Sequence, residues 1–148
     1  MTTATAVNAV IAAPLLEASA ELEVPFYDCD PAGIVWHGNY AKYLDLARCA
    51  LLERIDYGYA RMAESGYTWP VIDYWVRHIK PLNFGQRVLV KAWLQEWEVR
   101  FKVGYLITDA ASGARLCKGH TVQVAVRTDT GEMQLASPAV LRQKLGQA

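Results

Sequence analysis

The chain is poor in the residues that build metal sites and covalent cross-links. Its 148 residues include three cysteines and three histidines. Cys29, Cys49 and Cys117 show no paired spacing, and the histidines are scattered, whereas zinc sites and disulfide frameworks repeat short spacings. We therefore predict no metal and no disulfide. Unpaired thiols of this kind suit a reducing cytoplasm.

The sequence also lacks an excess of charge and a long apolar run. Fifteen Lys and Arg residues balance fifteen Asp and Glu residues, so general binding to a polyanion such as nucleic acid is not expected. No apolar stretch approaches the roughly 20 residues of a transmembrane helix. The Ala-rich N-terminus has no basic residue before Lys42, which is not typical of a signal peptide. We predict neither nucleic-acid nor membrane partners.

The sequence does contain enough apolar material for one core. Its hydrophobic content is 53%, and a chain of this length normally folds as a single domain. We expect residues 1–20 to form a flexible N-terminal extension. Residues 21–148 should form the domain.

A long helix is predicted from Asn39 to about Ser65, with Gly66 as its stop. Apolar residues recur through this segment at Tyr40, Tyr43, Leu44, Ala47, Leu51 and Ile55. Positions three and four apart share one face of a helix, and glycine is common just past a helix end. One face of this helix should therefore cover a core.

Strands are predicted on both sides of this helix. A strand-like run, 22–27, precedes it, and a β-rich half follows. The later strands are Val71–Lys80, Arg87–Trp97, Arg100–Thr108 and Arg115–Arg127, separated by turn-forming residues. Ser137 and Pro138 should cap and begin a short helix that ends near Leu145. This order predicts an α+β fold, with one long helix across a curved antiparallel sheet of about five strands.

Two of the predicted strands carry bulky apolar side chains on both faces. They are the segments Val71–Val76 and Val88–Leu94. One helix can cover only one face of the sheet, and soluble monomers rarely leave a large apolar patch exposed. We therefore expect a symmetric partner, giving a homodimer or a homotetramer.

One loop concentrates chemically active residues. The segment from Asp28 to Gly38 holds two carboxylates, a histidine, two glycines and a proline, between the first strand and the helix. Pro31 restricts its own backbone and that of Asp30, and Gly33 permits close backbone approach or a positive φ. Loops on a rigid scaffold often present chemistry. We predict that Asp30 is a catalytic group; an Asx-turn or helix-capping role is the structural alternative.

The sequence from Phe26 to Tyr40 resembles the N-terminal signature of hotdog-fold acyl-CoA thioesterases, and is most similar to the 4-hydroxybenzoyl-CoA thioesterase family. The shared pattern is Asp-x-Asp-x-x-Gly-x-x-x-His/Tyr-x-x-Tyr, and the resemblance extends over residues 21–130. It implies the hotdog fold and an acyl-CoA substrate, with active sites between subunits. It also implies that Asp30 is the catalytic carboxylate and that the backbone N–H near His37 polarises the thioester carbonyl.

The other polar residues of the loop and strands have weaker claims to a role. His37 lies at the expected helix start, where N–H groups lack intrahelical partners and can stabilise a developing oxyanion. This role needs only the backbone, so a role for the imidazole stays open. We expect Asp28 to be a solvated loop acid. His78 and His120 are isolated on strands, where core or rim positions are expected.

Two groups of residues are candidates for binding the substrate. Gly33, Trp36 and Tyr40 lie near Asp30 in sequence, and an aromatic lining would favour an aromatic or flat acyl group. Arg100 and Lys102 share one face of a strand and could bind the phosphates of CoA. They would have to contact a CoA held by a neighbouring subunit. An ordinary solvated strand edge is the alternative for these two cations.

The predicted function is hydrolysis of a short-chain or aromatic acyl-CoA to free acid and CoA, without a cofactor. A thiolate leaves easily, so one carboxylate could suffice, either as nucleophile or as general base. Two alternatives remain. A hotdog-fold hydratase or dehydratase would need Asp45 or Glu53 to converge on His37. A non-catalytic module that binds acyl thioesters would not need Asp30.

Overall fold

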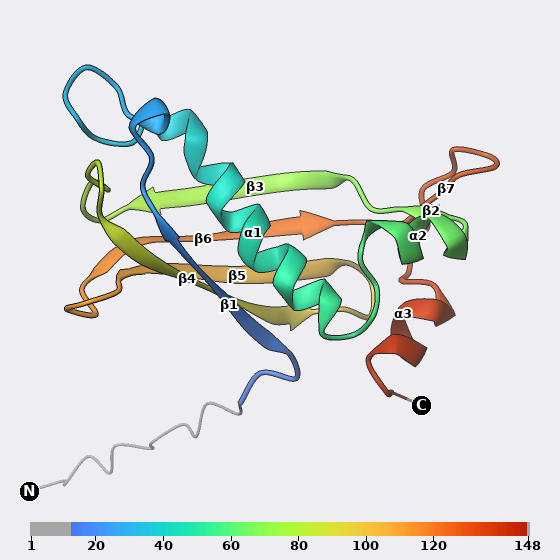
Figure 1. Cartoon of the computed structure of the whole chain (residues 1–148). Helices are drawn as coiled ribbons and strands as arrows, with labels where there is room; N and C mark the ends of the chain where they lie inside the picture. The colour runs from blue at the N-terminus through green and yellow to red at the C-terminus, as the bar shows by residue number, and fades with distance from the viewer. Residues whose placement is uncertain (1–12, 148) are drawn as a thin grey trace, which may run out of the picture.

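A five-stranded antiparallel sheet forms the centre of the computed structural model, which describes residues 13–147 (Figure 1). In chain order the strands are β1 (Glu17–Glu23), β3 (Val71–His78), β4 (Arg87–Glu96), β5 (Phe101–Asp109) and β6 (Arg115–Gln123). Their order in space is β1-β4-β5-β6-β3. The two edges of the sheet are therefore β1 and β3.

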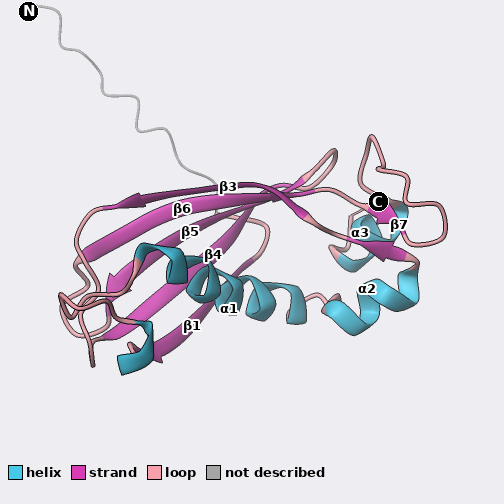
Figure 2. Ribbon diagram, turned by 90° about the horizontal axis from the view of Figure 1, so that it is seen from above, coloured by secondary structure: helices cyan, strands magenta, loops and turns pink. Residues whose placement is uncertain are grey.

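The helix α1 (Tyr40–Glu53) lies across one face of this sheet (Figure 2). Its buried apolar residues include the predicted set Tyr43, Leu44, Ala47 and Leu51. The facing strand β4 buries alternate residues, namely Val88, Val90, Ala92 and Leu94. The apolar face of the strand, formed by every second residue, thus packs against the apolar face of α1, formed by residues three and four apart. The predicted arrangement of a helix across a five-stranded sheet is confirmed.

The prediction of a continuous helix to Ser65 was wrong. The helix α1 ends at Glu53, and a separate helix, α2 (Tyr59–Ser65), begins after a turn in which Asp56 has φ of 52°. Tyr57 in this turn is only 1% exposed, and its hydroxyl accepts a hydrogen bond of 3.0 Å from Trp69 Nε1. Burial of this large ring, with its hydroxyl satisfied, stabilises the turn against continued helix.

The first strand begins before residue 21, where the domain was expected to start. The strand β1 begins at Glu17, and Ala18 and Ala20 are half-buried against the sheet. Alanine and glutamate, which make up most of this strand, are weak strand formers, so the sequence pattern gave little signal here. The strand ends at Glu23, and the chain then forms a short 3-10 helix (Phe26–Asp28) where the strand was expected to continue. Residues 1–12 of the expected extension lie outside the described residues.

The C-terminal part departs from its prediction in two details. The last predicted strand divides into β6 and β7 (Val126–Arg127), and β7 pairs with β2 (Tyr67–Thr68) in a small second sheet. The terminal helix is α3 (Ala139–Lys144), and Pro138 occupies its N-cap position. Ser137 does not cap it: its N–H donates to the Glu98 carbonyl (2.9 Å), and its hydroxyl makes no hydrogen bond.

Apolar side chains are exposed along the edge strand β3. Val71, Ile72, Tyr74 and Trp75 are each between 40% and 52% exposed. No helix of the part of the chain described covers the second face of the sheet, opposite α1 (Figure 2). The edge therefore combines unpaired backbone groups with apolar surface.

Candidate active site

The loop between β1 and α1 is attached to the connection between β3 and β4. Backbone bridges join Cys29 to Val35 within the loop and Ile34 to Asn83 across the two segments. The Val35 N–H also donates to the Leu82 carbonyl (2.9 Å). These hydrogen bonds fix the loop beside the end of β3, although β3 follows it by some forty residues.

Asp30 begins a tight turn inside this loop. The Gly33 N–H donates to the Asp30 carbonyl (3.0 Å), and Gly33 has φ of 78°. Aspartate, proline and glycine at the first, second and fourth positions are typical of such a turn. The Ala32 N–H donates to Oδ1 of Asp30 (2.9 Å), so the Asx-turn geometry is present. This bond orients the carboxylate and uses only one of its two oxygens.

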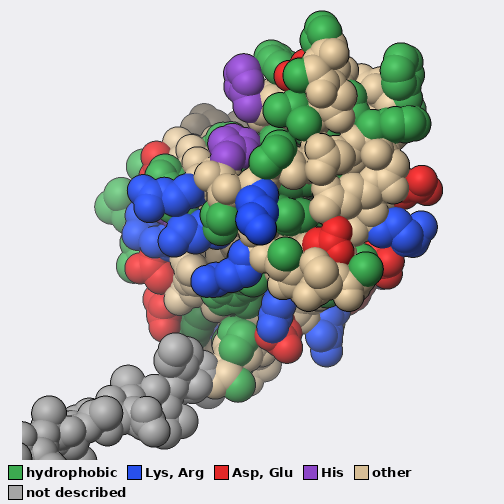
Figure 3. All heavy atoms as spheres, turned by 90° about the vertical axis from the view of Figure 1, so that its left-hand side faces the viewer, with side chains coloured by type: hydrophobic (Ala, Val, Ile, Leu, Met, Phe, Trp, Pro, Cys, Tyr) green, Lys and Arg blue, Asp and Glu red, His purple; other side chains and the backbone are tan. Residues whose placement is uncertain are grey.

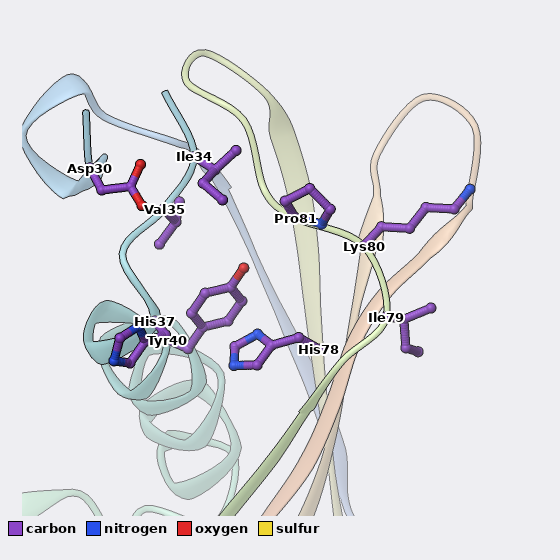
Figure 4. A pocket seen from close by; sticks show the side chains of 9 residues that line it. All are labelled: Asp30, Ile34, Val35, His37, Tyr40, His78, Ile79, Lys80 and Pro81. Carbon is purple, nitrogen blue, oxygen red and sulfur yellow. The ribbon is translucent and has the colours of Figure 1, made fainter. Parts of the chain in front are cut away.

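The Asp30 side chain borders a cleft of about 340 Å³. Figure 4 shows the residues that line it: Asp30, Ile34, Val35, His37, Tyr40, His78, Ile79, Lys80 and Pro81. They come from the loop, from the start of α1 and from the end of β3. The Asp30 carboxylate and the Tyr40 hydroxyl are directed toward the space between these segments (Figure 4). A small thioester group could therefore meet the carboxylate here.

His37 lies on the cleft, at the approach to α1. It begins a short 3-10 helix (His37–Asn39) that leads directly into α1 at Tyr40. The first N–H groups of a helix carry partial positive charge. The exposed Trp36 ring packs 5.1 Å from the His37 ring and against Gly38, where a Cβ would overlap it. Trp36 and Gly33 are neighbours of the cleft and do not line it.

Tyr40 and His78 meet in the lining of the cleft. Their rings pack edge to face, with centroids 4.4 Å apart. Burial raises the pKa of Tyr40, although a hydrogen bond with the Leu82 backbone opposes this shift, so its hydroxyl stays neutral at ordinary pH. His78 was expected at a core or rim position, and it is exposed on the rim of the cleft. Sequence reasoning missed its proximity to the loop because only the pairing of the strands brings the end of β3 to α1.

The prediction that Asp28 is a solvated loop acid was wrong. Asp28 is 4% exposed, and its carboxylate accepts hydrogen bonds from Lys42 Nζ (2.5 Å) and the Tyr43 hydroxyl (2.7 Å). Its carbonyl accepts two more, from the Trp36 N–H and from Asn39 Nδ2, both 2.9 Å long. The residue therefore joins the loop to the first turn of α1.

The electrostatics of Asp28 follow from these contacts. Burial raises the pKa of its carboxyl, but the hydrogen bonds from Lys42 and Tyr43 and the charge of Lys42 outweigh burial and leave the pKa below its ordinary value of 3.8. Burial and the neighbouring carboxylate raise the pKa of the Tyr43 phenol. Asp28 is thus an ionised, satisfied group.

Arg100 and Lys102 are not brought together with Asp30 within one protomer. Arg100 precedes β5, whose first residue, Phe101, pairs with Gln123 on β6. Gln123 pairs in turn with Val71, at the start of β3, whereas the cleft lies at the other end of β3. Arg100 Nε also forms an ion pair with Glu96 Oε2 (2.8 Å). A contact with CoA would have to come from a neighbouring subunit, as the sequence interpretation required.

Two structural findings concern partners of other kinds. Within residues 13–147, no three His, Cys, Asp or Glu side chains are grouped as they would be around a metal ion. Across the same residues, no helix has the length and apolar character needed to cross a membrane.

Comparison with known proteins places this geometry in a family. The sequence matches the thioesterase-like superfamily over residues 24–144. A Bacillus subtilis (strain 168) protein, YneP, which is named as a proposed acyl-CoA thioesterase, is 33% identical over 85 residues. That alignment covers 57% of this chain and 61% of YneP. The chain thus spans less than two thirds of this relative.

Solved structures share the fold. A DHNA-CoA thioesterase from Staphylococcus aureus superposes with a TM-score of 0.74 at 27% identity, covering 80% of each chain. A 4-hydroxybenzoyl-CoA thioesterase variant, in complex with 4-hydroxybenzoyl-CoA, gives a TM-score of 0.75 at 19% identity, over 87% of this chain and 98% of that one. The resemblance seen in the loop is confirmed. The chain has the hotdog fold and belongs to the thioesterase-like superfamily.

Proposed function

We propose that the protein is an acyl-CoA thioesterase that hydrolyses a short-chain or aromatic acyl-CoA to free acid and CoA. The observation that carries this proposal is the position of Asp30 on the cleft. One oxygen of its carboxylate is held by the Ala32 N–H, while the group borders a space next to the start of α1. The family of the chain and the thioesterases among its relatives support the same reaction.

Asp30 can act on the thioester in two ways. As general base, its carboxylate removes a proton from water, the water oxygen bonds to the carbonyl carbon, and the C–S bond breaks to release the thiolate, which takes up a proton. As nucleophile, it bonds to the same carbon and expels the thiolate, and water then hydrolyses the mixed anhydride. Both routes need a carboxylate that is oriented and accessible.

Backbone N–H groups near His37 stabilise the negative charge that develops on the carbonyl oxygen. They lie at the start of a helix, and His37 lines the same cleft as Asp30; the helix dipole favours an anion there. Tyr40, which lines the cleft, and Trp36 and Gly33 beside it are the residues proposed to contact the acyl group. The aromatic rings of Tyr40 and Trp36 favour a flat acyl group.

The alternative functions are less well supported. A hydratase or dehydratase would need an acid from α1 to face His37, but Asp45 Oδ1 forms an ion pair with Arg48 Nη2 (2.7 Å). A module that only binds acyl thioesters has no use for an oriented carboxylate. Of the three functions, hydrolysis alone gives a role both to the oriented Asp30 carboxylate and to the N–H groups near His37.

Thiol release from a panel of aliphatic and aryl CoA thioesters tests the function. Wild type should hydrolyse at least one member of the panel, and Asp30→Asn should be nearly inactive on it. Asp129→Asn serves as the control, because Asp129 is an exposed carboxylate whose partner is Arg127. If Asp30→Asn hydrolyses the best substrate as fast as the control does, Asp30 is not catalytic. A rapid-quench search for an acylated Asp30 peptide separates the nucleophilic route from the general-base route.

We further propose that the active protein is a homodimer or a homotetramer, assembled through the β3 edge. Its exposed apolar side chains and unpaired backbone favour pairing with a second copy. Such an assembly would also allow Arg100 and Lys102 to approach a neighbouring subunit's CoA.

Light scattering after size-exclusion chromatography tests the assembly. Wild type should elute above 16.5 kDa, the mass of one chain. Ile72→Arg on the edge should dissociate it, and Leu135→Arg, at an exposed apolar residue outside the edge, should not. A fully active wild-type monomer would refute the interface.

We place the protein in the cytoplasm. Cys29, Cys49 and Cys117 are free thiols, which suits a reducing compartment. Fractionation of cells with detection of the tagged protein tests this location; recovery in an extracytoplasmic fraction would contradict it.

A further inference from the structure

An imidazole at the end of β3 lies on the cleft, and the reaction proposed above gives it no role. His78 is the last residue of β3 and pairs with Cys117 on β6. Its ring packs edge to face on the Tyr40 ring, with centroids 4.4 Å apart, so His78 projects from the α1 side of the sheet. The residue lines the same cleft as Asp30 and is exposed. Figure 3, viewed from the end of the molecule that holds this cleft, shows histidine side chains at the surface.

A β-bulge follows His78 directly and turns the chain along the cleft. The N–H groups of Ile79 and Lys80 both donate to the Leu116 carbonyl (2.9 and 3.0 Å), so two residues of one segment oppose one residue of the other. A regular strand presents only every second residue to one side, yet His78, Ile79, Lys80 and Pro81 all line the cleft. Bulges often re-aim side chains next to active sites. The end of β3 is thus shaped to border this space.

Asp30 and His78 reach the cleft from different segments, the loop and the end of β3 (Figure 4). The cleft has a volume of about 340 Å³, at the small end of the roughly 300–1,000 Å³ of ligand pockets. A thioester whose carbonyl carbon lies at Asp30 therefore has its sulfur, one bond away, in the same small space. Within residues 13–147, the His78 imidazole forms no hydrogen bond or ion pair with another residue, so its N–H is free to bind a ligand.

The leaving sulfur takes up a proton, and few groups of the lining can supply it. An alkyl thiol has a pKa of about 8.5, so the thiol and not the thiolate is the main product at neutral pH. Burial raises the pKa of the Tyr40 phenol, which makes it a poor acid, and the Lys80 side chain extends away from Asp30 (Figure 4). An imidazole exchanges protons readily near neutral pH. His37 begins the helix that is proposed to hold the carbonyl oxygen, which leaves His78 for the sulfur.

We propose that His78 is the general acid of the reaction and protonates the leaving sulfur as the C–S bond breaks. This inference rests on the proposed function. In the general-base route, Asp30 removes a proton from water, the water oxygen bonds to the carbonyl carbon, and the electron pair of the C–S bond passes to sulfur. The imidazolium N–H of His78 gives that sulfur its proton. Asp30 then returns its proton through solvent to the neutral imidazole, so the products are the free acid and the thiol. In the nucleophilic route, the same proton transfer accompanies formation of the mixed anhydride.

Two thioesters that share one acyl group test this role. One is the ester of N-acetylcysteamine, an alkyl thiol, and the other is the ester of thiophenol, whose lower pKa lets its thiolate leave faster. The variant His78→Phe keeps an aromatic ring against Tyr40 but has no N–H. It should lower kcat/KM for the alkyl ester by at least about tenfold, and it should leave kcat/KM for the phenyl ester within about twofold of wild type. The unchanged phenyl ester also shows that the variant is folded.

Two further variants make the result specific. His120→Phe is the matched control, because His120 stacks on Trp75 and does not line the cleft, and it should change the hydrolysis of neither ester. His37→Ala tests the other imidazole of the lining. If His78→Phe affects neither ester or lowers both equally, or if His37→Ala alone selectively lowers hydrolysis of the alkyl ester, the proposal is wrong.

Asp30→Asn separates this proposal from the proposed function. It should lower hydrolysis of both esters, because the carboxylate is needed whichever thiol leaves. A selective loss in His78→Phe together with a fully active Asp30→Asn would refute the role of Asp30 alone. Loss of both esters in Asp30→Asn together with a fully active His78→Phe would refute the general acid alone. A wild-type protein that hydrolyses neither ester would refute both.

Discussion

Two aspartates in one loop, separated by a single residue, have opposite environments. Asp28 is buried, and both of its oxygens accept hydrogen bonds from α1 side chains, Lys42 and Tyr43. Asp30 is half-buried on a cleft, and one of its oxygens is held by the Ala32 N–H of its own turn. The same functional group is thus fully bound by the helix at one position, and at the other it is left open to the cleft, where we propose that it reacts. The difference lies in which neighbours supply the donors: α1 for Asp28, the local turn for Asp30.

This difference predicts that the two aspartates fail in different ways when each is changed to asparagine. Asp30→Asn should lower kcat by at least about 100-fold, because it removes the only carboxylate proposed to act on the thioester. Its free energy of unfolding should change by less than about 1 kcal/mol, since an asparagine oxygen can still accept from the Ala32 N–H. Urea denaturation and steady-state kinetics on one preparation measure both. If Asp30→Asn instead unfolds much more easily, and its activity falls only as far as the fraction of folded protein falls, Asp30 is structural.

Asp28→Asn should show the reverse pattern. The carboxylate accepts from a buried tyrosine hydroxyl and from Lys42, and hydrogen bonds to charged groups contribute about 1.5–3 kcal/mol each. Because Lys42 is half exposed and its share is screened, we expect a loss of about 2 kcal/mol in the free energy of unfolding. At temperatures where the variant is folded, kcat should stay within about tenfold of wild type. Stability equal to wild type would contradict the structural role.

The sequence identified the loop and the turn at Asp30 because their signals are local. Proline after Asp30 and glycine three residues after it define a turn without reference to the rest of the chain, and helical spacing identified the buried face of α1. The same local signals failed for Asp28. Its burial depends on Tyr43, fifteen residues later, and the residues adjacent to Asp28 in the sequence do not predict that contact.

The break after Glu53 and the cleft lining at His78 were missed for a related reason. Tyr57 leaves the helix because a pocket beside Trp69 accepts its ring, and that pocket exists only in the folded sheet. His78 reaches the cleft because β3 is an edge strand that ends beside α1. Strand order is a property of the whole fold, so spacing along the chain could not supply it.

The stabilising contribution of Asp28 should decrease as the pH falls. The pKa of this carboxyl in the folded protein lies below its ordinary value of 3.8, so its contribution is fully present above about pH 4 and is lost as the pH falls through the lowered value. The stability difference between wild type and Asp28→Asn should therefore shrink in acid. Urea midpoints at pH 6 and pH 3 measure it. Asp109 and Asp129, whose pKa values are held at about 2, affect both proteins equally and cancel. If the stability difference between wild type and Asp28→Asn grows in acid, the pKa of Asp28 is raised in the folded protein and not lowered.

His37→Ala should reduce kcat by less than about tenfold, a smaller effect than Asp30→Asn, because the proposed contact with the oxyanion is made by the backbone and survives truncation. His120→Ala is a suitable control, since His120 stacks on Trp75 and does not line the cleft. A loss as deep as that of Asp30→Asn, in a folded protein, would make the imidazole a catalytic partner. That result would also favour the hydratase or dehydratase alternative.

The smallest expected effect belongs to Lys42, the exposed member of the Asp28 contacts. Its side chain is 55% exposed, so water can partly replace it, and exposed ion pairs contribute about 0.2–1 kcal/mol. Lys42→Met should therefore lower the free energy of unfolding by less than about 1 kcal/mol at neutral pH. The Tyr43 hydroxyl still donates to Asp28, but without the nearby positive charge the pKa of Asp28 should rise, so acid destabilisation should begin at a higher pH than in wild type. Lys91→Met, which breaks a surface pair with Glu17, should leave that onset unchanged. If Lys42→Met costs as much as Asp28→Asn, the ammonium rather than the tyrosine hydroxyl is the main partner of the buried carboxylate.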